Sequence, residues 1–541
     1  MKPIGIFAAK WLGIFGAIVG GLSPALAQGP IIFQQPQSQI IAVGYPTTFK
    51  VTTTNQSPYP KVQWWNDQGP IPGATNPFVP VFGTQASNLP STATYTFTNT
   101  QLSDAGSYGV TLSNSNGDTV SSNATLGVIP AYTFITMAGV AGTAGTNDGT
   151  GSAARFTSPR HLALDAQGNL FVTDFGNDII RKVTSAGIVS TFTGTPDVVG
   201  TNDGPADTAL FNLPHGIALD GAGNIFVTDL STNYKGGTIR KITPGGFVTT
   251  IAGQQNISGT NDGAGGNALF AAPWGIAVDA AENVFVSDST TIRKLTSADG
   301  TNWLVTTIAG LPGVPGKVDG TNSDARFYYP DGLAIDGAGR IFVDDEFNGL
   351  IREMSPSGTN WVVSTIGQFS QMPGPSALAL GTNDNIYLAG QGEPVIFEMT
   401  GAGTNWMQTV IAGRNVAIAG EGTNDGTGIT ARFDSPHGIA LDKNGNLFVA
   451  DEYGNIRKGW SSDAHGITAL NSPFVTGNQV QLKIVVTTGG PANFTLLQSE
   501  SLGGPWVTNS DAQLITNIPG LFYQLIAPLK NESGEFYRLK Q

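Results

Sequence analysis

Six stretches of the chain repeat one pattern, and this repeat restricts the possible folds more than any other feature of the sequence. Each copy opens on a proline, passes through an apolar run and a turn such as "DAQGN", and ends in a second apolar run such as "LFVTD". Apolar and polar residues alternate in these runs, which is typical of short antiparallel strands joined by tight turns. The copies begin at Pro159, Pro214, Pro273, Pro330, Pro375 and Pro436.

Two further strand-like elements complete each copy. An "IRK"-like element follows the second run, and "TTIAG"-like elements separate successive copies. Four strands in a unit of roughly 45 to 60 residues predict one blade of a β-propeller, so six copies predict six blades. The last copy lacks its "TTIAG" element, whereas "FITMAG" at 134–139 precedes the first copy. We predict that this segment forms the outermost strand of the sixth blade and closes the ring.

The motif "GTNDG" lies between copies, where it predicts a connecting loop rather than a ligand site. Asn and Gly tolerate a positive φ, and Asp bonds its own backbone, so these residues form turns. The motif does not have the alternating carboxylates of a calcium loop. The phenylalanine that follows each motif is expected to pack the loop down. The motifs lie at 145–149, 200–204, 259–263 and 422–426, and the phenylalanines are Phe156, Phe211, Phe270 and Phe433.

An arginine recurs in the "IRK" element of every copy except the fifth. Recurrence at one structural position predicts a shared packing or salt-bridge role, with the strand aspartates such as Asp174 and Asp451 as partners. The arginines are Arg181, Arg240, Arg293, Arg352 and Arg457.

The sixth copy, "GTNDG…ARF…PHGIALDKNGNLFVADEYGNIRK", and its relatives resemble the NHL repeat of six-bladed β-propellers, over residues 131–460. The fifth copy departs from this pattern, because Gly381 and Gly390 replace the two aspartates and Phe397 replaces the arginine. It also lacks the "GTNDG" loop. A symmetric ring of six identical sites is therefore not expected.

Residues 30–128 resemble a bacterial immunoglobulin-like domain. Trp64 stands where the core tryptophan of the third strand is expected, and "DAGSY", which ends at Tyr108, matches the tyrosine corner. Val51 and Val110 occupy the positions of the usual inter-sheet cysteines. Burial of these valines with Trp64 must replace the disulfide. The resemblance implies adhesion or spacing rather than chemistry.

The two ends of the chain have separate roles. Residues 1–27 carry lysines, a short apolar run and "ALA" before Gln28, which predicts a secretory signal peptide. Export of a chain without cysteine fits a bacterial extracytoplasmic protein. Residues 461–471 are predicted as a linker. Residues 472–541 are predicted as a small β-sandwich, resembling the C-terminal β-domains of large secreted bacterial proteins.

Three polar residues follow the opening prolines of alternate copies, namely His215, Asp331 and His437. On a six-bladed ring they would converge at the channel mouth, where two histidines and a carboxylate suit a divalent metal ion. The NHL resemblance agrees, since a peptide-amidating lyase of this propeller family binds its metal with histidines from separate blades. The alternative is that these side chains are solvated polar residues. His161 lies one position later and is predicted to stand outside this set.

The segment "GTNW" recurs in copies three, four and five and places Trp303, Trp361 and Trp406 in long hairpins. Exposed on neighbouring blades, they would form an arc suited to stacking on sugar rings or on a protein. Alternatively, each tryptophan packs its own hairpin.

The sequence thus predicts an all-β protein with a signal peptide, an Ig-like β-sandwich, a six-bladed NHL-type β-propeller and a small C-terminal β-sandwich. The net charge of −13 argues against nucleic acid as a partner. We favour a non-catalytic binding or adhesion protein, exported to the cell surface, medium or periplasm of a bacterium, with a protein or glycan partner and no cofactor. The alternative is a metal-dependent extracytoplasmic lyase or hydrolase at the channel mouth.

Overall fold

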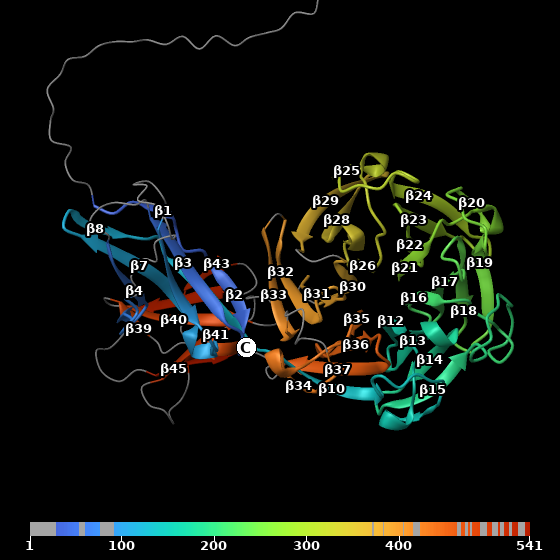
Figure 1. Ribbon diagram of the computed structural model, residues 1–541, viewed down its shortest axis with the longest axis horizontal. Helices are drawn as coiled ribbons and strands as arrows, with labels where there is room; N and C mark the ends of the chain where they lie inside the picture. The colour runs from blue at the N-terminus through green and yellow to red at the C-terminus, as the bar shows by residue number, and fades with distance from the viewer. Residues whose placement is uncertain are drawn as a thin grey trace, which may run out of the picture. The chain divides into compact units, whose positions relative to one another are not determined.

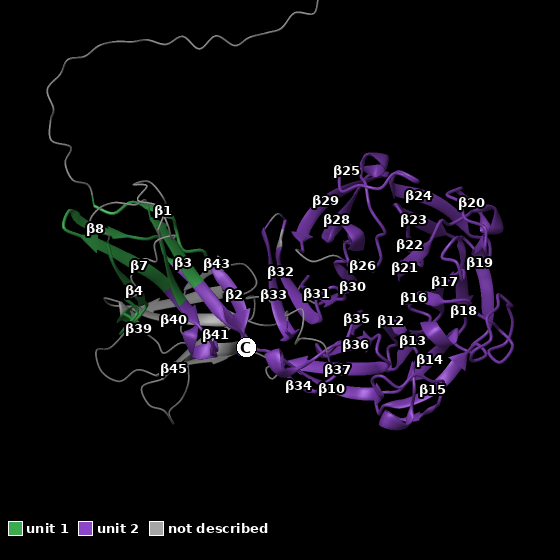
Figure 2. Ribbon diagram, in the orientation of Figure 1, with its two compact units in different colours: residues 1–37, 49–95, 108–123 green, residues 38–48, 96–107, 124–541 purple. Residues whose placement is uncertain are grey.

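The computed structural model describes most of the chain and divides it into two compact units (Figure 2). The signal peptide predicted for residues 1–27 lies outside the described residues. Described are residues 29–53, 60–75, 91–369, 373–381, 384–403, 405–414 and 422–461, and the strands between residues 467 and 540. The first unit comprises residues 1–37, 49–95 and 108–123, and the second comprises residues 38–48, 96–107 and 124–541.

The first unit contains most of the predicted immunoglobulin-like region. Trp64 and Tyr108 are buried, and Phe49 stacks on both rings at centroid distances of 6.4 and 5.0 Å. Val51 and Val110 are also fully buried, as expected for residues that replace a disulfide. The strands of residues 30–129 are β1 (Ile32–Gln34), β2 (Gln39–Ala42), β3 (Thr47–Thr53), β4 (Lys61–Asn66), β5 (Gly69–Pro70), β6 (Ser91–Phe97), β7 (Gly106–Asn114), β8 (Gly117–Val120) and β9 (Ala124–Ile129), with the 3₁₀ helix η1 (Leu102–Asp104).

Six antiparallel sheets make up most of the second unit, and we number them sheets 1 to 6 in the order of their proline-led strands. Sheet 1 contains β12 (Pro159–Leu164), β13 (Leu170–Asp174), β14 (Ile179–Val183), β15 (Ile188–Thr193) and β11 (Gly149–Thr150). Sheet 2 contains β16 (Pro214–Leu219), β17 (Ile225–Leu230), β18 (Gly237–Ile242) and β19 (Val248–Gln254). Sheet 3 contains β21 (Pro273–Val278), β22 (Val284–Asp288), β23 (Thr291–Thr296), β24 (Leu304–Gly310) and β20 (Gly263–Ala264).

The other three sheets follow the same order of strands. Sheet 4 contains β26 (Leu333–Ile335), β27 (Ile341–Asp345), β28 (Leu350–Ser357), β29 (Asn360–Gln368) and β25 (Gly320–Thr321). Sheet 5 contains β30 (Pro375–Leu380), β31 (Ile386–Gly390), β32 (Val395–Ala402) and β33 (Asn405–Gly413). Sheet 6 contains β35 (Pro436–Leu441), β36 (Leu447–Asp451), β37 (Asn455–Ser461), β10 (Tyr132–Gly139) and β34 (Gly426–Thr427).

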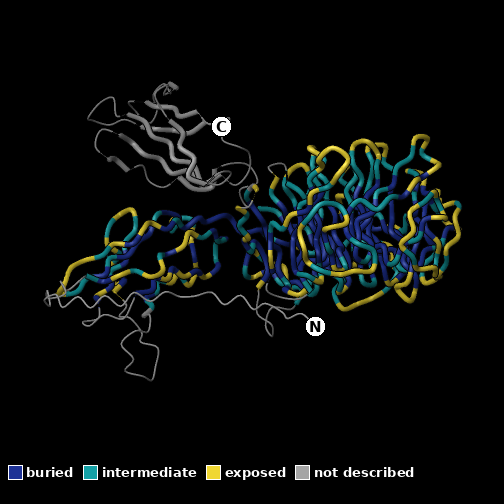
Figure 3. Tube along the Cα trace, turned by 90° about the horizontal axis from the view of Figure 1, so that it is seen from above, coloured by how far each residue is buried: buried dark blue, intermediate teal, exposed yellow. Residues whose placement is uncertain are grey.

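The six sheets surround a common centre (Figure 1), and we call this arrangement the ring. Their first strands contact one another in the cyclic order β12, β16, β21, β26, β30 and β35, and β35 contacts β12 again. In sheet 6, β10 pairs antiparallel with β37, with Phe134 opposite Gly459. The predicted closure by the segment at 134–139 is therefore present. Figure 3 shows buried residues concentrated within the sheets and exposed residues in the loops.

Within the described residues the fold is all-β, without an α-helix. Short 3₁₀ helices occupy several connections, namely η2 (Gly151–Ala153), η3 (Phe175–Asn177), η4 (Gly265–Asn267), η5 (Asn322–Asp324), η6 (Glu346–Asn348) and η7 (Gly428–Thr430). Searched over the same residues, the chain contains no helix that is both long and apolar enough to cross a membrane.

The recurring arginines are fully buried and connect the "GTNDG" loops to the sheets. In sheet 2, Arg240 donates from Nη1 to the buried Asp229 at 2.7 Å and from Nη2 to Asp203 of the loop at 2.9 Å. Its guanidinium also lies 5.0 Å from the ring of the buried Phe211. The predicted salt bridges to Asp174 and Asp451 are present at 2.9 and 3.7 Å. The loops thus have an architectural role, as predicted, and their aspartates are the second partner of four of the arginines. The fifth, Arg352, pairs with Asp319, which lies in the corresponding connection without the motif.

Sheet 5 has no arginine at this position and contains a separate buried polar network. Phe397 occupies the arginine position, and the adjacent Glu398 is buried. Glu398 accepts hydrogen bonds from Asn385 Nδ2 at 2.8 Å and from Tyr387 Oη at 3.2 Å, and Tyr132 Oη donates to Tyr387 Oη at 3.3 Å. Without a cation among these partners, burial raises the pKa of Glu398 from 4.5 to about 7.

This raised pKa predicts that Glu398 lowers stability as the pH increases. The folded state retains the Glu398 proton up to about pH 7, whereas the unfolded state releases it near pH 4.5. The contribution of Glu398 should therefore be complete below pH 4.5 and decline by about 3 kcal/mol by pH 7. Urea unfolding of the full chain from pH 4 to 8 measures this dependence. The difference between wild type and Glu398→Gln isolates it, and parallel curves for the two proteins would contradict the prediction.

The strands that follow the ring form two further sheets. One contains β38 (Ile467–Leu470), β39 (Phe474–Thr476), β40 (Gln479–Val486), β43 (Gln513–Ile518) and β44 (Phe522–Pro528), and the other contains β41 (Thr495–Ser499), β42 (Val507–Thr508) and β45 (Phe536–Lys540). Strand β38 lies inside the range predicted as a linker, because Ile467 pairs with Val486 of β40.

Candidate metal centre

Four side chains that can bind a metal ion meet at the first strands of the ring. They are His161 of β12, His215 of β16, Asp331 just before β26, and His437 of β35, and one ligand atom from each lies within 4.8 Å of those from the others. His161 Nε2 is 3.5 Å from Asp331 Oδ1, and His215 Nδ1 is 3.8 Å from the same oxygen. The structure therefore brings together the three residues that the sequence placed at alternate copies, and adds His161.

The three imidazoles form a tight group. The ring centroids of His161 and His215 are 4.9 Å apart, and His437 lies 5.2 and 5.3 Å from them. All four residues are buried. Trp274, which follows the opening proline of sheet 3, packs edge-on against His215 at 4.7 Å. The group is thus a packed feature of the ring interior rather than a set of solvated side chains at its mouth.

Hydroxyl groups fix the backbone that carries the cluster. In each case a serine or threonine of the preceding sheet donates to the carbonyl oxygen of a cluster residue, which links the sheets and positions the side chain. The pairs are Thr173 with His215 at 2.7 Å, Ser287 with Asp331 at 2.9 Å, and Ser376 with His437 at 3.1 Å.

The prediction that His161 stands outside the set is wrong. It rested on the offset of His161 by one position from the residues that follow the opening prolines. In a regular strand, successive side chains alternate between opposite faces. The pairing of β12 with β13 is interrupted between Pro159 and Leu162, so the residues between them do not follow the alternation. The sequence does mark His161 as unusual, because four other sheets have glycine at the same position. These glycines are Gly216, Gly275, Gly332 and Gly438.

The environment of the cluster lowers the pKa of two of its histidines, His215 and His437. Burial, together with the neighbouring His161 and the Arg160 guanidinium, holds the pKa of His215 well below 6.5. Burial, Arg160 and the other histidines lower the pKa of His437 in the same way. Neutral imidazole is the form that binds a metal ion.

Several buried polar atoms of the cluster have no hydrogen-bond partner among the described residues. A buried polar atom left without a partner costs about 1–3 kcal/mol, so such a concentration points to a ligand. The atoms are His161 Nε2, His215 Nδ1 and Nε2, His437 Nδ1 and Asp331 Oδ1.

Further ionisable groups surround the cluster. Asp344 Oδ1 and Oδ2 are buried without a hydrogen-bond partner among the described residues, and burial beside Glu346 raises the pKa of Asp344 well above its usual range. Burial and the Asp331 carboxylate also raise the pKa of Glu346. Arg160 forms a 2.8 Å ion pair with Glu452. A bound cation would favour the ionised form of these carboxyl groups.

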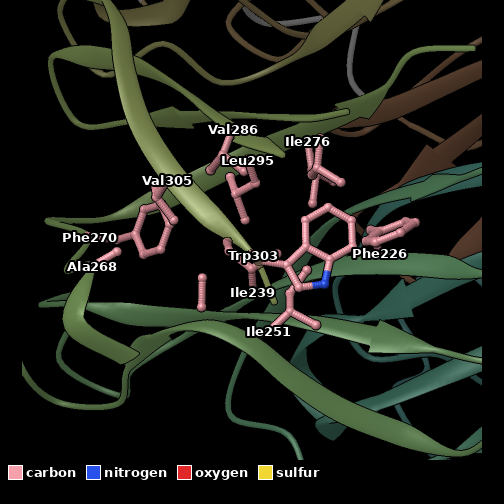
Figure 4. Close-up of a cluster of buried hydrophobic side chains, with 12 residues drawn as sticks. Phe226, Ile239, Ile251, Ala268, Phe270, Ile276, Val286, Leu295, Trp303 and Val305 are labelled. Atoms are coloured by element: carbon pink, nitrogen blue, oxygen red, sulfur yellow. The ribbon is translucent and has the colours of Figure 1, made fainter. Parts of the chain in front are cut away.

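The three tryptophans do not form the exposed arc that we expected, because Trp303 is buried. Trp303 is only 3% exposed and lies within an apolar cluster that joins sheets 2 and 3 (Figure 4), 5.7 Å from Phe226. Trp361 and Trp406 are half-buried and pack against Phe285 and Phe342 of the preceding sheets. Each long hairpin thus directs its tryptophan onto the neighbouring sheet, because that placement buries the indole.

Comparison with protein-family models finds two matches. The immunoglobulin I-set domain matches residues 30–128, and the NHL repeat matches residues 433–457, which lie in sheet 6. The chain contains an I-set domain and an NHL repeat. These domains fit a binding or adhesion module.

Two curated proteins match less than half of the chain, and one solved structure shows a distant likeness. Protein SUPPRESSOR OF QUENCHING 1, chloroplastic, of Arabidopsis thaliana is 31% identical over 178 residues, 31% of this chain and 16% of the relative. NHL repeat-containing protein 2 of Gallus gallus is 27% identical over 267 residues, 43% of this chain and 36% of the relative. An auxiliary nutrient binding protein of Bacteroides ovatus shares 14% identity over 80% of this chain and 98% of its own, with a TM-score of 0.34. The chain thus spans well under half of either curated relative.

Proposed function

We propose that the ring is a six-bladed β-propeller of the NHL type that binds one divalent transition-metal ion at its centre. The cluster of His161, His215, Asp331 and His437 carries this proposal, because one ligand atom from each lies within 4.8 Å of the others and several of these buried atoms accept or donate no hydrogen bond within the described residues. Three imidazoles and one carboxylate suit Zn²⁺ and its neighbours among the divalent first-row metals, whereas Ca²⁺ and Mg²⁺ prefer oxygen ligands.

We propose that the whole protein is an exported, non-catalytic binding or adhesion protein. The I-set match and the NHL repeat support this function, and the sequence of residues 1–27 supports export. Bacterial cell surface, medium or periplasm is the proposed location, and a protein or glycan is the proposed partner. The metal-centred ring would serve as a rigid platform for that partner.

The proposed metal centre predicts the metal content of the purified protein. Purified mature protein, dialysed against metal-free buffer, should retain about one transition-metal ion per chain, since four convergent ligands bind such ions tightly. Elemental analysis by mass spectrometry measures the ratio. The His215→Ala, His437→Ala double variant should lose the metal, while Asp203→Asn, a change in a connecting loop that pairs with Arg240, should retain it. Wild type that stays metal-free after incubation with Zn²⁺ would refute the proposal.

The second candidate is a metal-dependent lyase or hydrolase. Glu346 and Arg160 favour it, since a carboxyl group of raised pKa and a guanidinium beside a metal centre are groups that acid–base chemistry uses. A catalytic metal must keep one coordination position open for water or substrate. The two candidates therefore differ in the number of protein ligands on the metal.

A further inference from the structure

We infer that His161 closes the coordination shell, so that the ion is a structural link between four sheets and not a catalytic centre. This inference rests on the proposed metal binding. Closed sites with four protein ligands are typical of structural zinc, whereas catalytic zinc has three protein ligands and a water molecule.

The distances within the cluster suit four ligands on one ion. Ligand atoms around a tetrahedral ion, with bonds of about 2.0–2.1 Å, lie about 3.3 Å apart. Asp331 Oδ1 is already 3.5 Å from His161 Nε2 and 3.8 Å from His215 Nδ1. Small side-chain rotations would complete the shell, because hydroxyl groups hold the backbone of His215, Asp331 and His437 in place.

The first strands pack closely against one another around the cluster. A Cβ atom on Gly275 would lie 2.0 Å from the carbonyl oxygen of Asp331, and one on Gly438 would lie 2.3 Å from that of Arg160. First strands that approach so closely require glycine at these positions. The side chains of His161, His215 and Asp331 are 11%, 0% and 2% exposed. These ligand side chains are therefore largely shielded from solvent.

The four ligands come from sheets 1, 2, 4 and 6. Sheets 1 and 6 are neighbours across the point where the ring closes, and the only covalent continuity there is the chain entering sheet 1 from β10. The chain has no cysteine and therefore no disulfide to reinforce the closure. An ion held by His161 and His437 spans this junction, and His215 and Asp331 extend the link to the opposite side of the ring.

Cobalt substitution of the full chain tests the coordination number. Four-coordinate Co²⁺ absorbs strongly in the visible range, and azide binds to Co²⁺ only where a position is open. We expect wild-type protein loaded with Co²⁺ to show the strong absorption and to keep its spectrum unchanged on titration with azide. In His161→Gly, which introduces the residue that four other sheets have at this position, Co²⁺ affinity should fall at least roughly tenfold. Azide should then change the spectrum.

Each outcome decides one of the two proposals. A wild-type spectrum that azide alters would overturn the closed site while leaving metal binding intact. Failure of wild type to bind Co²⁺ at all would refute the metal centre itself. The wild-type titration needs no variant, so misfolding of His161→Gly would not remove the test. Metal should also raise the Tm of wild type more than that of His161→Gly, and equal increases would contradict the structural role.

Discussion

Replacement of Arg240 by methionine should lower the free energy of unfolding by about 3–5 kcal/mol, as expected when one partner of a buried ion pair is removed. The guanidinium is fully buried and donates to Asp229, Asp203 and the carbonyl oxygens of Leu210 and Asn202. Methionine fills a similar volume, so the loss arises from the hydrogen bonds and charge rather than from a cavity. Asp229 would remain buried without its cation.

Asp203→Asn is the matched control for this prediction. The Asp203 side chain is 42% exposed, so its ion pair with Arg240 is screened by water and should contribute about 1 kcal/mol or less. Equilibrium unfolding in urea measures both variants. If Arg240→Met and Asp203→Asn cost the same, the buried pair is not the dominant interaction and the argument fails.

Replacement of Trp303 by alanine should also cost about 3–5 kcal/mol, the range for large buried aromatic residues. The indole is surrounded by apolar side chains of sheets 2 and 3, including Phe226, Ile276 and Val305 (Figure 4). Its Nε1 donates to the carbonyl oxygen of Gly300 at 3.3 Å. The alanine variant would leave a cavity between two sheets that the close-packed ring cannot readily fill.

Trp406→Ala provides the comparison, because this half-buried tryptophan loses less contact on truncation. We expect Trp406→Ala to destabilise the chain by clearly less than Trp303→Ala in the same urea experiment. A Trp303→Ala variant as stable as wild type would show that the indole is exposed in solution, and would restore the surface role that the sequence suggested.

The repeat in the sequence was sufficient to predict the strands and their order. Apolar alternation and the turn residues are local signals, so the first strand begins at the expected proline in five copies. In the fourth copy the first strand, β26, begins only at Leu333. The displaced "FITMAG" segment predicted the pairing of β10 with β37, since a missing strand at one end of a repeat must come from the other end. The buried Trp64 and Tyr108 were likewise predicted from their spacing.

The partner of the buried arginine and the burial of Trp303 could not be predicted from the sequence, because both depend on tertiary structure. The partner of Arg240 in the "GTNDG" loop lies 37 residues away, and no local pattern links two such positions. Trp303 is buried because its indole packs against Phe226 of the neighbouring sheet. The segment that contains Trp303 is itself polar, so the sequence suggested that the indole is exposed.

His161 shows the same limit at the candidate metal site. The offset of His161 by one position predicted that it stands apart from the proline-following residues. In a regular strand, with its period of two, neighbouring side chains face different ways. The irregular start of β12 breaks that period, and the ring then brings His161 within 3.5 Å of Asp331, 170 positions later in the chain. Sequence by itself determined which residue types occupy the first strands. Only the closure of the ring decided which of them meet, because convergence depends on the shape of six sheets together and not on the spacing within any one.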